Sequence, residues 1–169
     1  MTRLKRYFPW VVAVLALLAA VTFGVLWQQE SARASEEDEL RAAATEFITD
    51  LTSISADTVE ADAEAIKEWA VGDFADEAEV FYGPKAIEAV VEADATTEGD
   101  VQELYVQSLA GGEGSVFAVV NYTVTNAGTE EPKSDIVRMS VELIQADGDW
   151  KVNSVRVLES PGTALPSAG

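Results

Sequence analysis

In the stretch VFAVVNYTVT, residues 116–125, every even position carries an apolar or aromatic side chain, whereas three of the odd positions are polar. Its polar members Asn121, Thr123 and Thr125 share one parity. Successive side chains of a strand point to opposite faces of a sheet, so this alternation predicts a β-strand with one buried face. The face predicted to be buried carries Val116, Ala118, Val120, Tyr122 and Val124.

Three more strands are predicted around this one. Residues 136–145 repeat the alternation, and residues 101–109 form the predicted first strand. In the last strand, Trp150 and Val152 have a parity that Val155 does not share, which predicts a β-bulge near residues 153–154. Turn signals rich in glycine, asparagine and aspartate separate the strands at residues 111–114, 126–128 and 147–149.

Residues before 94 follow a helical period instead. A first helix begins with a capping box formed by Ser35 and Asp38, and a second begins with the same arrangement at Asp57 and Glu60. Gly72 is predicted to end the second helix. A third helical region, residues 74–93, is interrupted at Gly83-Pro84. The apolar face of the first helix comprises Leu40, Ala43, Ala44, Phe47, Ile48, Leu51 and Ile54.

These elements predict an α+β domain over residues 36–159, with about three helices packed on a bent four-stranded antiparallel sheet. Helices followed by a bent antiparallel sheet are the arrangement of the cone-like ketosteroid-isomerase-like, or nuclear transport factor 2-like, fold. That step is an analogy from the order of the elements. Residues 160–169 are predicted to be a disordered tail, because they contain two prolines and few apolar side chains.

An apolar segment before the domain predicts a membrane anchor. Residues 8–27 contain no charge and have the length that a helix needs to cross the hydrocarbon. The stub, residues 1–7, carries Arg3, Lys5 and Arg6, which by the positive-inside rule places the amino terminus in the cytoplasm. A polar juncture, residues 28–35, which is either extended or a continuation of the helix, then leads to an extracytoplasmic domain at the cytoplasmic membrane.

The alternative to an anchor is a cleaved secretory signal. Ala32-Arg33-Ala34 has the small-x-small form of a cleavage site, but the apolar run exceeds the usual core of a signal peptide. The length of the run therefore favours the anchor. Within it, Ala16, Ala20 and Gly24 form a small-xxx-small stripe that predicts a packing face for another transmembrane helix.

The composition excludes several classes of site. The chain of 169 residues contains no cysteine and no histidine. Disulfides, thiolate zinc sites and catalytic triads that use histidine or cysteine are therefore excluded. Residues 28–169 hold all 30 acidic and 8 of the 11 basic residues, which gives this part a formal charge of −22. That charge disfavours nucleic acid and anionic lipid headgroups as partners.

No catalytic residue, cofactor site or metal site is predicted, and the protein is not expected to be an enzyme. The acids lie mostly on the polar sides of the predicted helices, and Asp50, Asp62 and Asp73 are candidates by residue type alone. Tyr122 is interpreted as a core aromatic residue. Residues 147–149 are interpreted as a hairpin turn and not as a calcium loop, because the 12-residue ligand pattern is absent.

Four stretches of this sequence resemble recurring stretches of the Mce-associated membrane proteins of actinobacteria. They are LTS at 51–53, GDF at 72–74, TVTNAGT at 123–129 and DGDWKVNSV at 147–155. The resemblance implies a cytoplasmic stub, one transmembrane helix and an outer cone-like domain. It also implies an accessory or stabilising role in an Mce-type importer of fatty acids or sterols, without catalytic residues. The sequence departs from the family at Asp149, where a basic residue is frequent, and in its acidity.

The resemblance thus favours a noncatalytic accessory subunit that has the membrane and other subunits of a lipid-transport complex as its partners. A membrane-tethered cone-fold enzyme or lipid-binding pocket is one alternative, and a secretion-system assembly factor of similar shape is another. A scaffold binds through exposed aromatic anchors. Phe81 and Tyr82, before the Gly83-Pro84 break, are the predicted interaction residues.

Overall fold

The computed structural model describes residues 33–128 and 131–158. The chain divides into two compact units, Met1–Asp38 and Glu39–Gly169. Of the first unit, residues 33–38 are described, and they are helical. The predicted stub, the predicted transmembrane segment and the predicted tail lie outside the described residues. No helix within the described ranges combines the length and the apolar character that crossing a bilayer requires.

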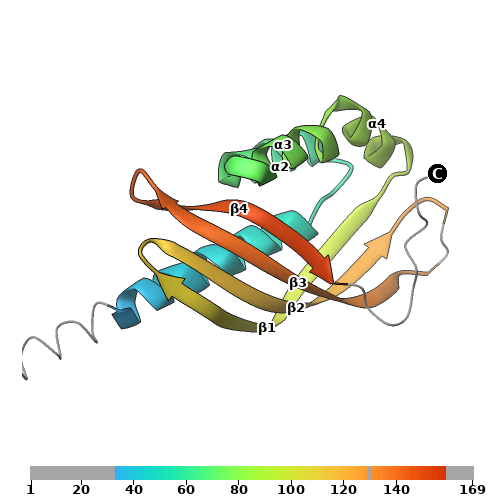
Figure 1. Ribbon diagram of the computed structural model, residues 1–169. Helices are drawn as coiled ribbons and strands as arrows, with labels where there is room; N and C mark the ends of the chain where they lie inside the picture. Colours follow the sequence, from blue (N-terminus) through green and yellow to red (C-terminus); the bar gives the residue numbers. More distant parts are fainter. Residues whose placement is uncertain (1–32, 129–130, 159–169) are drawn as a thin grey trace, which may run out of the picture. The chain divides into compact units, whose positions relative to one another are not determined.

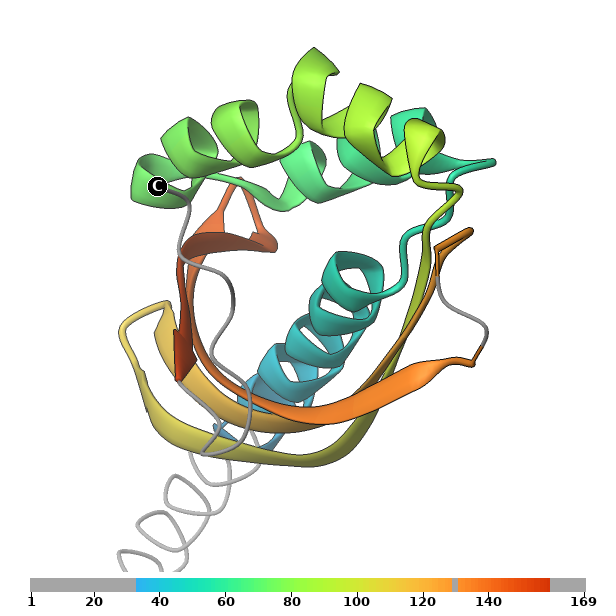
Figure 2. The ribbon, with the colours of Figure 1, turned by 90° about the vertical axis from the view of Figure 1, so that its right-hand side faces the viewer.

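The second unit is built on a single antiparallel sheet. Its strands run in the order β1 (Thr96–Ala110), β2 (Glu113–Thr125), β3 (Lys133–Ala146) and β4 (Asp149–Leu158). Each strand therefore pairs with its neighbour in the sequence, and the sheet curves strongly around one face (Figures 1 and 2). The predicted α+β class and the bent four-stranded antiparallel sheet are confirmed.

Two of the hairpins close with two residues that both have positive φ. Gly111 and Gly112 have φ values of 64° and 77°, and Asp147 and Gly148 have values of 56° and 97°. Such pairs match the right-handed twist of the flanking strands, which is why glycine and aspartate occupy them. The predicted hairpin turn at residues 147–149 is confirmed.

The parity change in the last strand corresponds to a β-bulge. Glu142 pairs with Ser154 while Leu143 pairs with Val152, so Asn153 is an extra residue without a partner in β3. The predicted bulge near residues 153–154 is confirmed. Because of this shift Val155, opposite Val141, lies on the core side of the sheet together with Val152, opposite Leu143.

The first strand begins earlier than predicted, at Thr96 and not at Val101. The connection after the first helix holds this extension in place. The Thr97 N–H donates to the carbonyl oxygen of Ile54 at 2.7 Å, and the Ile54 N–H donates to Thr97 Oγ1 at 3.0 Å. The extension carries no alternation of apolar residues, so the sequence pattern does not reveal it. It is held by these hydrogen bonds and by pairing with residues 121–125 of β2.

The described part of the chain contains four helices, one more than predicted. Residues 33–52 form the first, called here the long helix, and the others are α2 (Val59–Trp69), α3 (Gly72–Phe81) and α4 (Pro84–Glu92). The predicted third region is thus two helices, since Pro84 opens α4 at its first position. Gly83 fits between them because a Cβ there would lie 2.8 Å from the carbonyl oxygen of Glu79.

Three predicted helix ends are wrong. Residue 33 is already helical, so Ser35 lies inside the long helix and does not cap it. The helix α2 has no capping hydrogen bond from a side chain, and Asp62 instead accepts from the Thr58 hydroxyl at 2.8 Å. Gly72 begins α3 and does not end α2, because its φ of 54° redirects the chain after Val71.

The core lies in the hollow of the sheet, which residues 39–52 of the long helix occupy (Figure 2). Phe47 is fully buried there and makes edge-to-face contacts with Phe74 and Trp69, with ring centroids 5.5 and 6.0 Å away. Among the described residues, Thr52 is the buried polar residue, and its hydroxyl donates to the Ile48 carbonyl. Helix and sheet together bury Leu40, Ala44, Phe47, Ile48, Val116, Ala118, Val120, Met139, Val141, Leu143 and Val152.

Candidate functional site: an acidic groove

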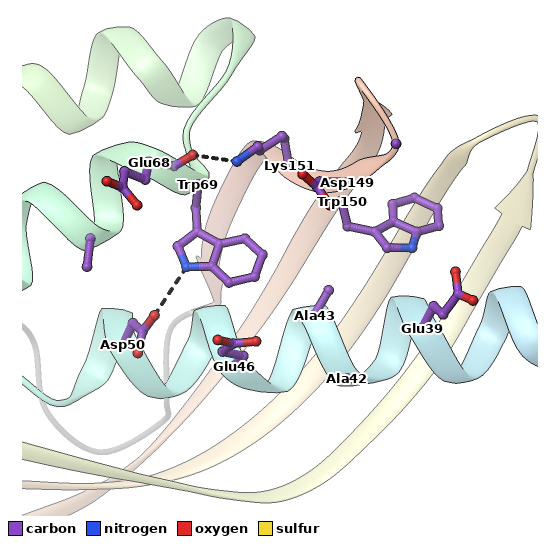
Figure 3. Close-up of a pocket in the computed structure, with 12 residues that line it drawn as sticks. Glu39, Ala42, Ala43, Glu46, Asp50, Glu68, Trp69, Asp149, Trp150 and Lys151 are labelled. Atoms are coloured by element: carbon purple, nitrogen blue, oxygen red, sulfur yellow. Dashed lines mark hydrogen bonds between the residues drawn. The ribbon is translucent and has the colours of Figure 1, made fainter.

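A cavity of about 600 Å³ lies on the surface of the second unit, between the long helix, α2 and the β3–β4 hairpin (Figure 3). Its volume is within the range of ligand pockets in proteins. We call it the acidic groove, because five of its twelve lining residues are acids and one is basic. The lining comprises Glu39, Ala42, Ala43, Glu46, Asp50, Ala65, Glu68, Trp69, Gly148, Asp149, Trp150 and Lys151.

One wall of the groove is a stripe of the long helix. Glu39, Glu46 and Asp50 are spaced by seven and four residues, which places them on one face of the helix. Ala42 and Ala43 lie between these acids, and their short side chains leave open space between the carboxylates (Figure 3). The stripe therefore presents negative charge along an otherwise small-residue surface.

The second wall is Trp69 of α2, and it is held in place from two sides. Its ring nitrogen donates a hydrogen bond to Asp50 Oδ2 at 3.1 Å. Its ring packs edge-on against Phe47 at an interplanar angle of 65°. Asp50, a candidate by residue type alone in the sequence, thus lies in the groove and orients the tryptophan (Figure 3).

The third wall is the β3–β4 hairpin, which is attached to α2 and the connection after it. Lys151 Nζ donates to the carbonyl oxygen of Glu68 at 3.0 Å, and the Val71 N–H donates to the carbonyl oxygen of Val152 at 2.9 Å. These bonds join segments that are distant in the sequence. The groove is therefore a built feature of the fold and not a gap between loose loops.

Trp150 completes the lining with an unusual polar atom. Its side chain is 7% exposed, and its ring nitrogen is buried without a hydrogen-bond partner. Figure 3 shows this nitrogen on the edge of the ring that faces the long helix, on the side of Glu39. An indole N–H is a donor only, so this atom requires an acceptor.

The composition of the groove suits a cationic ligand. The carboxylates attract positive charge, and the half-buried Trp69 ring offers a face on which a cation is stabilised. No group of three or more potential metal ligands has the geometry of a metal site in residues 33–128 and 131–158.

The architecture around this groove matches that of solved structures. The VirB8 protein of Agrobacterium tumefaciens is 14% identical, with a TM-score of 0.59 over 77% of this chain and 96% of that one. CagV of Helicobacter pylori, a VirB8 homologue of a type IV secretion system, is 12% identical, with a TM-score of 0.56 over 73% and 98%.

A third structure gives the fold its name. An NTF2-like protein with a cystatin-like fold from Novosphingobium aromaticivorans is 16% identical, with a TM-score of 0.55 over 79% of this chain and 90% of that one. The second unit has a nuclear transport factor 2-like fold. No protein-family model matches the sequence, and none of the curated proteins matches it. At these identities the likeness shows the fold of the NTF2-like domain and not its function.

The residues predicted from the sequence are dispersed over the NTF2-like domain. Phe81 ends α3 and is 67% exposed, whereas Tyr82 packs against the core. Asp62 accepts from the Ser55 N–H and the Thr58 hydroxyl, and Asp73 lies in the first turn of α3. Ala16, Ala20 and Gly24 lie outside the described residues, and their role stays a prediction.

Tyr82 makes the stability of the domain depend on pH in the alkaline range. Burial raises the pKa of Tyr82 to about 12, and nearby Tyr122 adds to the rise. A phenol whose pKa is raised by folding stabilises the fold fully below its ordinary value of 10.0, and this contribution is lost as the pH rises towards the folded value. We expect urea unfolding to show falling stability above about pH 10, and a smaller fall in Tyr82→Phe. An equal fall in both proteins would contradict this assignment.

Proposed function

We propose that this chain is a noncatalytic, membrane-anchored subunit that assembles a multi-subunit envelope complex of the secretion type. Its NTF2-like domain lies on the outer side of the cytoplasmic membrane and docks other subunits. The observation that carries the proposal is the filled hollow of the sheet. Leu40, Phe47 and Ile48 of the long helix are fully buried there.

A filled hollow argues against turnover chemistry. Enzymes of this shape place an acid or base in an apolar pocket, where its pKa is displaced for catalysis. In the described residues, the buried side chains are apolar except for Thr52, and the Thr52 hydroxyl is engaged by the Ile48 carbonyl. The groove at the surface, with its excess of carboxylates, is suited to contact with a partner.

Two further observations support a secretion-type complex. VirB8 and CagV share the fold over most of their length, and CagV is a component of a type IV secretion system. The uncharged segment at residues 8–27 supports anchoring, and the cationic stub supports the outward orientation of the domain. The likeness in fold thus supports a secretion-type complex, and the sequence supports the membrane orientation.

The second candidate function is that of an accessory subunit of an Mce-type importer of fatty acids or sterols. It is favoured by the four stretches at residues 51–53, 72–74, 123–129 and 147–155 that resemble the Mce-associated proteins. Both candidates give the chain the same task, which is to hold other subunits together. They differ in which subunits disappear when the chain is absent.

A deletion strain distinguishes the two candidates. Quantitative proteomics of its membranes is expected to show lower abundance of secretion-apparatus subunits, restored when the full chain is supplied again. Loss of importer subunits together with fatty acid or sterol uptake would favour the second candidate. Unchanged levels of both sets of subunits, with a changed metabolite, would refute the assembly role and favour an enzyme.

A further inference from the structure

The acidic groove contains a buried donor that the fold itself does not satisfy. The Trp150 ring nitrogen lacks an acceptor although its side chain is more than nine-tenths buried. Leaving a buried polar group unpaired is unfavourable, so native proteins pair nearly all of them. An acceptor supplied by a ligand in the groove would satisfy this donor.

We propose that the acidic groove binds an extended, arginine-containing segment of a partner subunit. An arginine guanidinium lies between Glu46 and Asp50 against the face of Trp69. Because the Trp150 ring nitrogen is buried, the ring turns towards the groove when the segment binds, and a backbone carbonyl of the segment then accepts the Trp150 N–H. This inference rests on the proposed function and adds the chemistry of the partner.

The dimensions of the groove fit such a segment. Glu39 and Asp50 are eleven residues apart in one helix, which corresponds to a rise of about 16 Å. An extended peptide covers that distance with about five residues. Trp150 lies on the side of Glu39, and Trp69 is hydrogen-bonded to Asp50 (Figure 3). The carbonyl contact at Trp150 and the guanidinium contact at Trp69 therefore lie at opposite ends of the groove.

Arginine is favoured over lysine by the geometry around Trp69. A guanidinium group stacks on an aromatic face and binds carboxylates with parallel hydrogen bonds, whereas an ammonium group acts as a point charge. Asp50 accepts from Trp69 through Oδ2, and a carboxylate has capacity for further bonds. The Glu46 carboxylate lies one helical turn before Asp50 on the same face.

Charge favours a basic partner over a second copy of this chain. Residues 28–169 carry a formal charge of −22, so two such domains repel each other. Within the groove, Lys151 already donates to the Glu68 carbonyl. The positive charge that complements the groove therefore comes from another protein.

The experiment uses the full-length chain in detergent micelles, with Trp10→Phe and Trp27→Phe replacements. The protein has four tryptophans, so Trp69 and Trp150 of the groove are then the remaining reporters. The probe is a capped pentapeptide of alternating glycine and arginine. We expect a saturable change in tryptophan fluorescence at low salt, weaker binding above about 0.1 M salt, and no response to the same peptide with glutamate in place of arginine.

Matched variants test the two contacts separately. Glu46→Gln combined with Asp50→Asn removes two charges and keeps an acceptor for Trp69, and we expect binding about tenfold weaker or more. Glu88→Gln removes a charge from an exposed position of α4 outside the groove and is expected to bind normally. Trp150→Phe keeps an aromatic ring but removes the N–H, and calorimetry should show binding roughly 2- to 10-fold weaker.

Three results would overturn the proposal. They are equal binding by the groove variant and Glu88→Gln, unchanged binding by Trp150→Phe, and a fluorescence response to calcium ions without one to the arginine peptide. Circular dichroism of each variant confirms that it is folded. If the protein fails to bind the peptide while the deletion strain still loses partner subunits, the groove proposal is wrong and the proposed function stands. The partner contact would then lie on another surface.

Discussion

Phe47→Ala is expected to lower the free energy of unfolding of the NTF2-like domain by about 3–5 kcal/mol. Phe47 is fully buried between sheet and helices, and its ring contacts both Phe74 and Trp69. Truncation removes the buried apolar surface and leaves a cavity that these rings cannot fill without losing their own contacts. Because a whole domain is stable by roughly 5–15 kcal/mol, much of its stability would be lost.

Phe81→Ala is the matched control. The substitution is chemically identical, but Phe81 is 67% exposed at the end of α3. We expect an effect within about 0.5 kcal/mol. Urea unfolding monitored by circular dichroism measures both variants, and similar losses in the two would contradict the packing described for Phe47. Because Phe81→Ala keeps the fold, it also allows the predicted interaction role of Phe81 to be tested by co-purification.

Gly72→Ala is expected to destabilise the domain by roughly 2–4 kcal/mol. Gly72 has a φ of 54°, a conformation that is strained for any residue with a side chain. A Cβ at this position would also overlap the Asn153 side chain. Strain and overlap therefore add at the junction where the chain leaves α2 and meets the bulge of β4.

Gly148→Ala separates the backbone strain from the steric overlap. Gly148 has a φ of 97°, but an added Cβ there meets no atom within 4 Å. We expect only the conformational penalty of about 1–2 kcal/mol. Combining Gly72→Ala with Asn153→Ala should recover part of the difference, which a double-mutant cycle from urea unfolding measures. Equal losses at the two glycines would show that the contact with Asn153 is unimportant.

The sequence predicted those parts of the fold that local periodicity encodes. The alternation in residues 116–125 identified β2, and the changed parity between Val152 and Val155 located the bulge at Asn153. The break at Gly83-Pro84 was also visible, because proline opens a helix but does not continue one. Each of these signals arises from neighbours in the chain.

Features that depend on distant segments were missed. The start of β1 at Thr96 is set by hydrogen bonds between Thr97 and Ile54, and Gly72 serves a contact with Asn153 that no local pattern reveals. The acidic groove is assembled from three elements, and Ala42 and Ala65 matter in it for the space that they leave. The five acids offered a signal by charge, but their convergence on Trp69 and Trp150 required the fold.

The position of the long helix also determines the order in which the protein can fold. This helix is synthesised before the sheet, yet Leu40 lies against Gly114, and the rest of its apolar face packs in a hollow that β2, β3 and β4 enclose. Most of the stability of a helix in a protein comes from the tertiary packing of its apolar face, and this helix lacks that packing until the sheet has formed. The four strands pair with their neighbours in the sequence, and such local contacts form rapidly. The helix can pack fully only after the last strand has joined the sheet. During biosynthesis the apolar face of this helix thus stays unprotected until β4 has been made, and we expect a product truncated before Trp150 to be degraded by quality-control proteases.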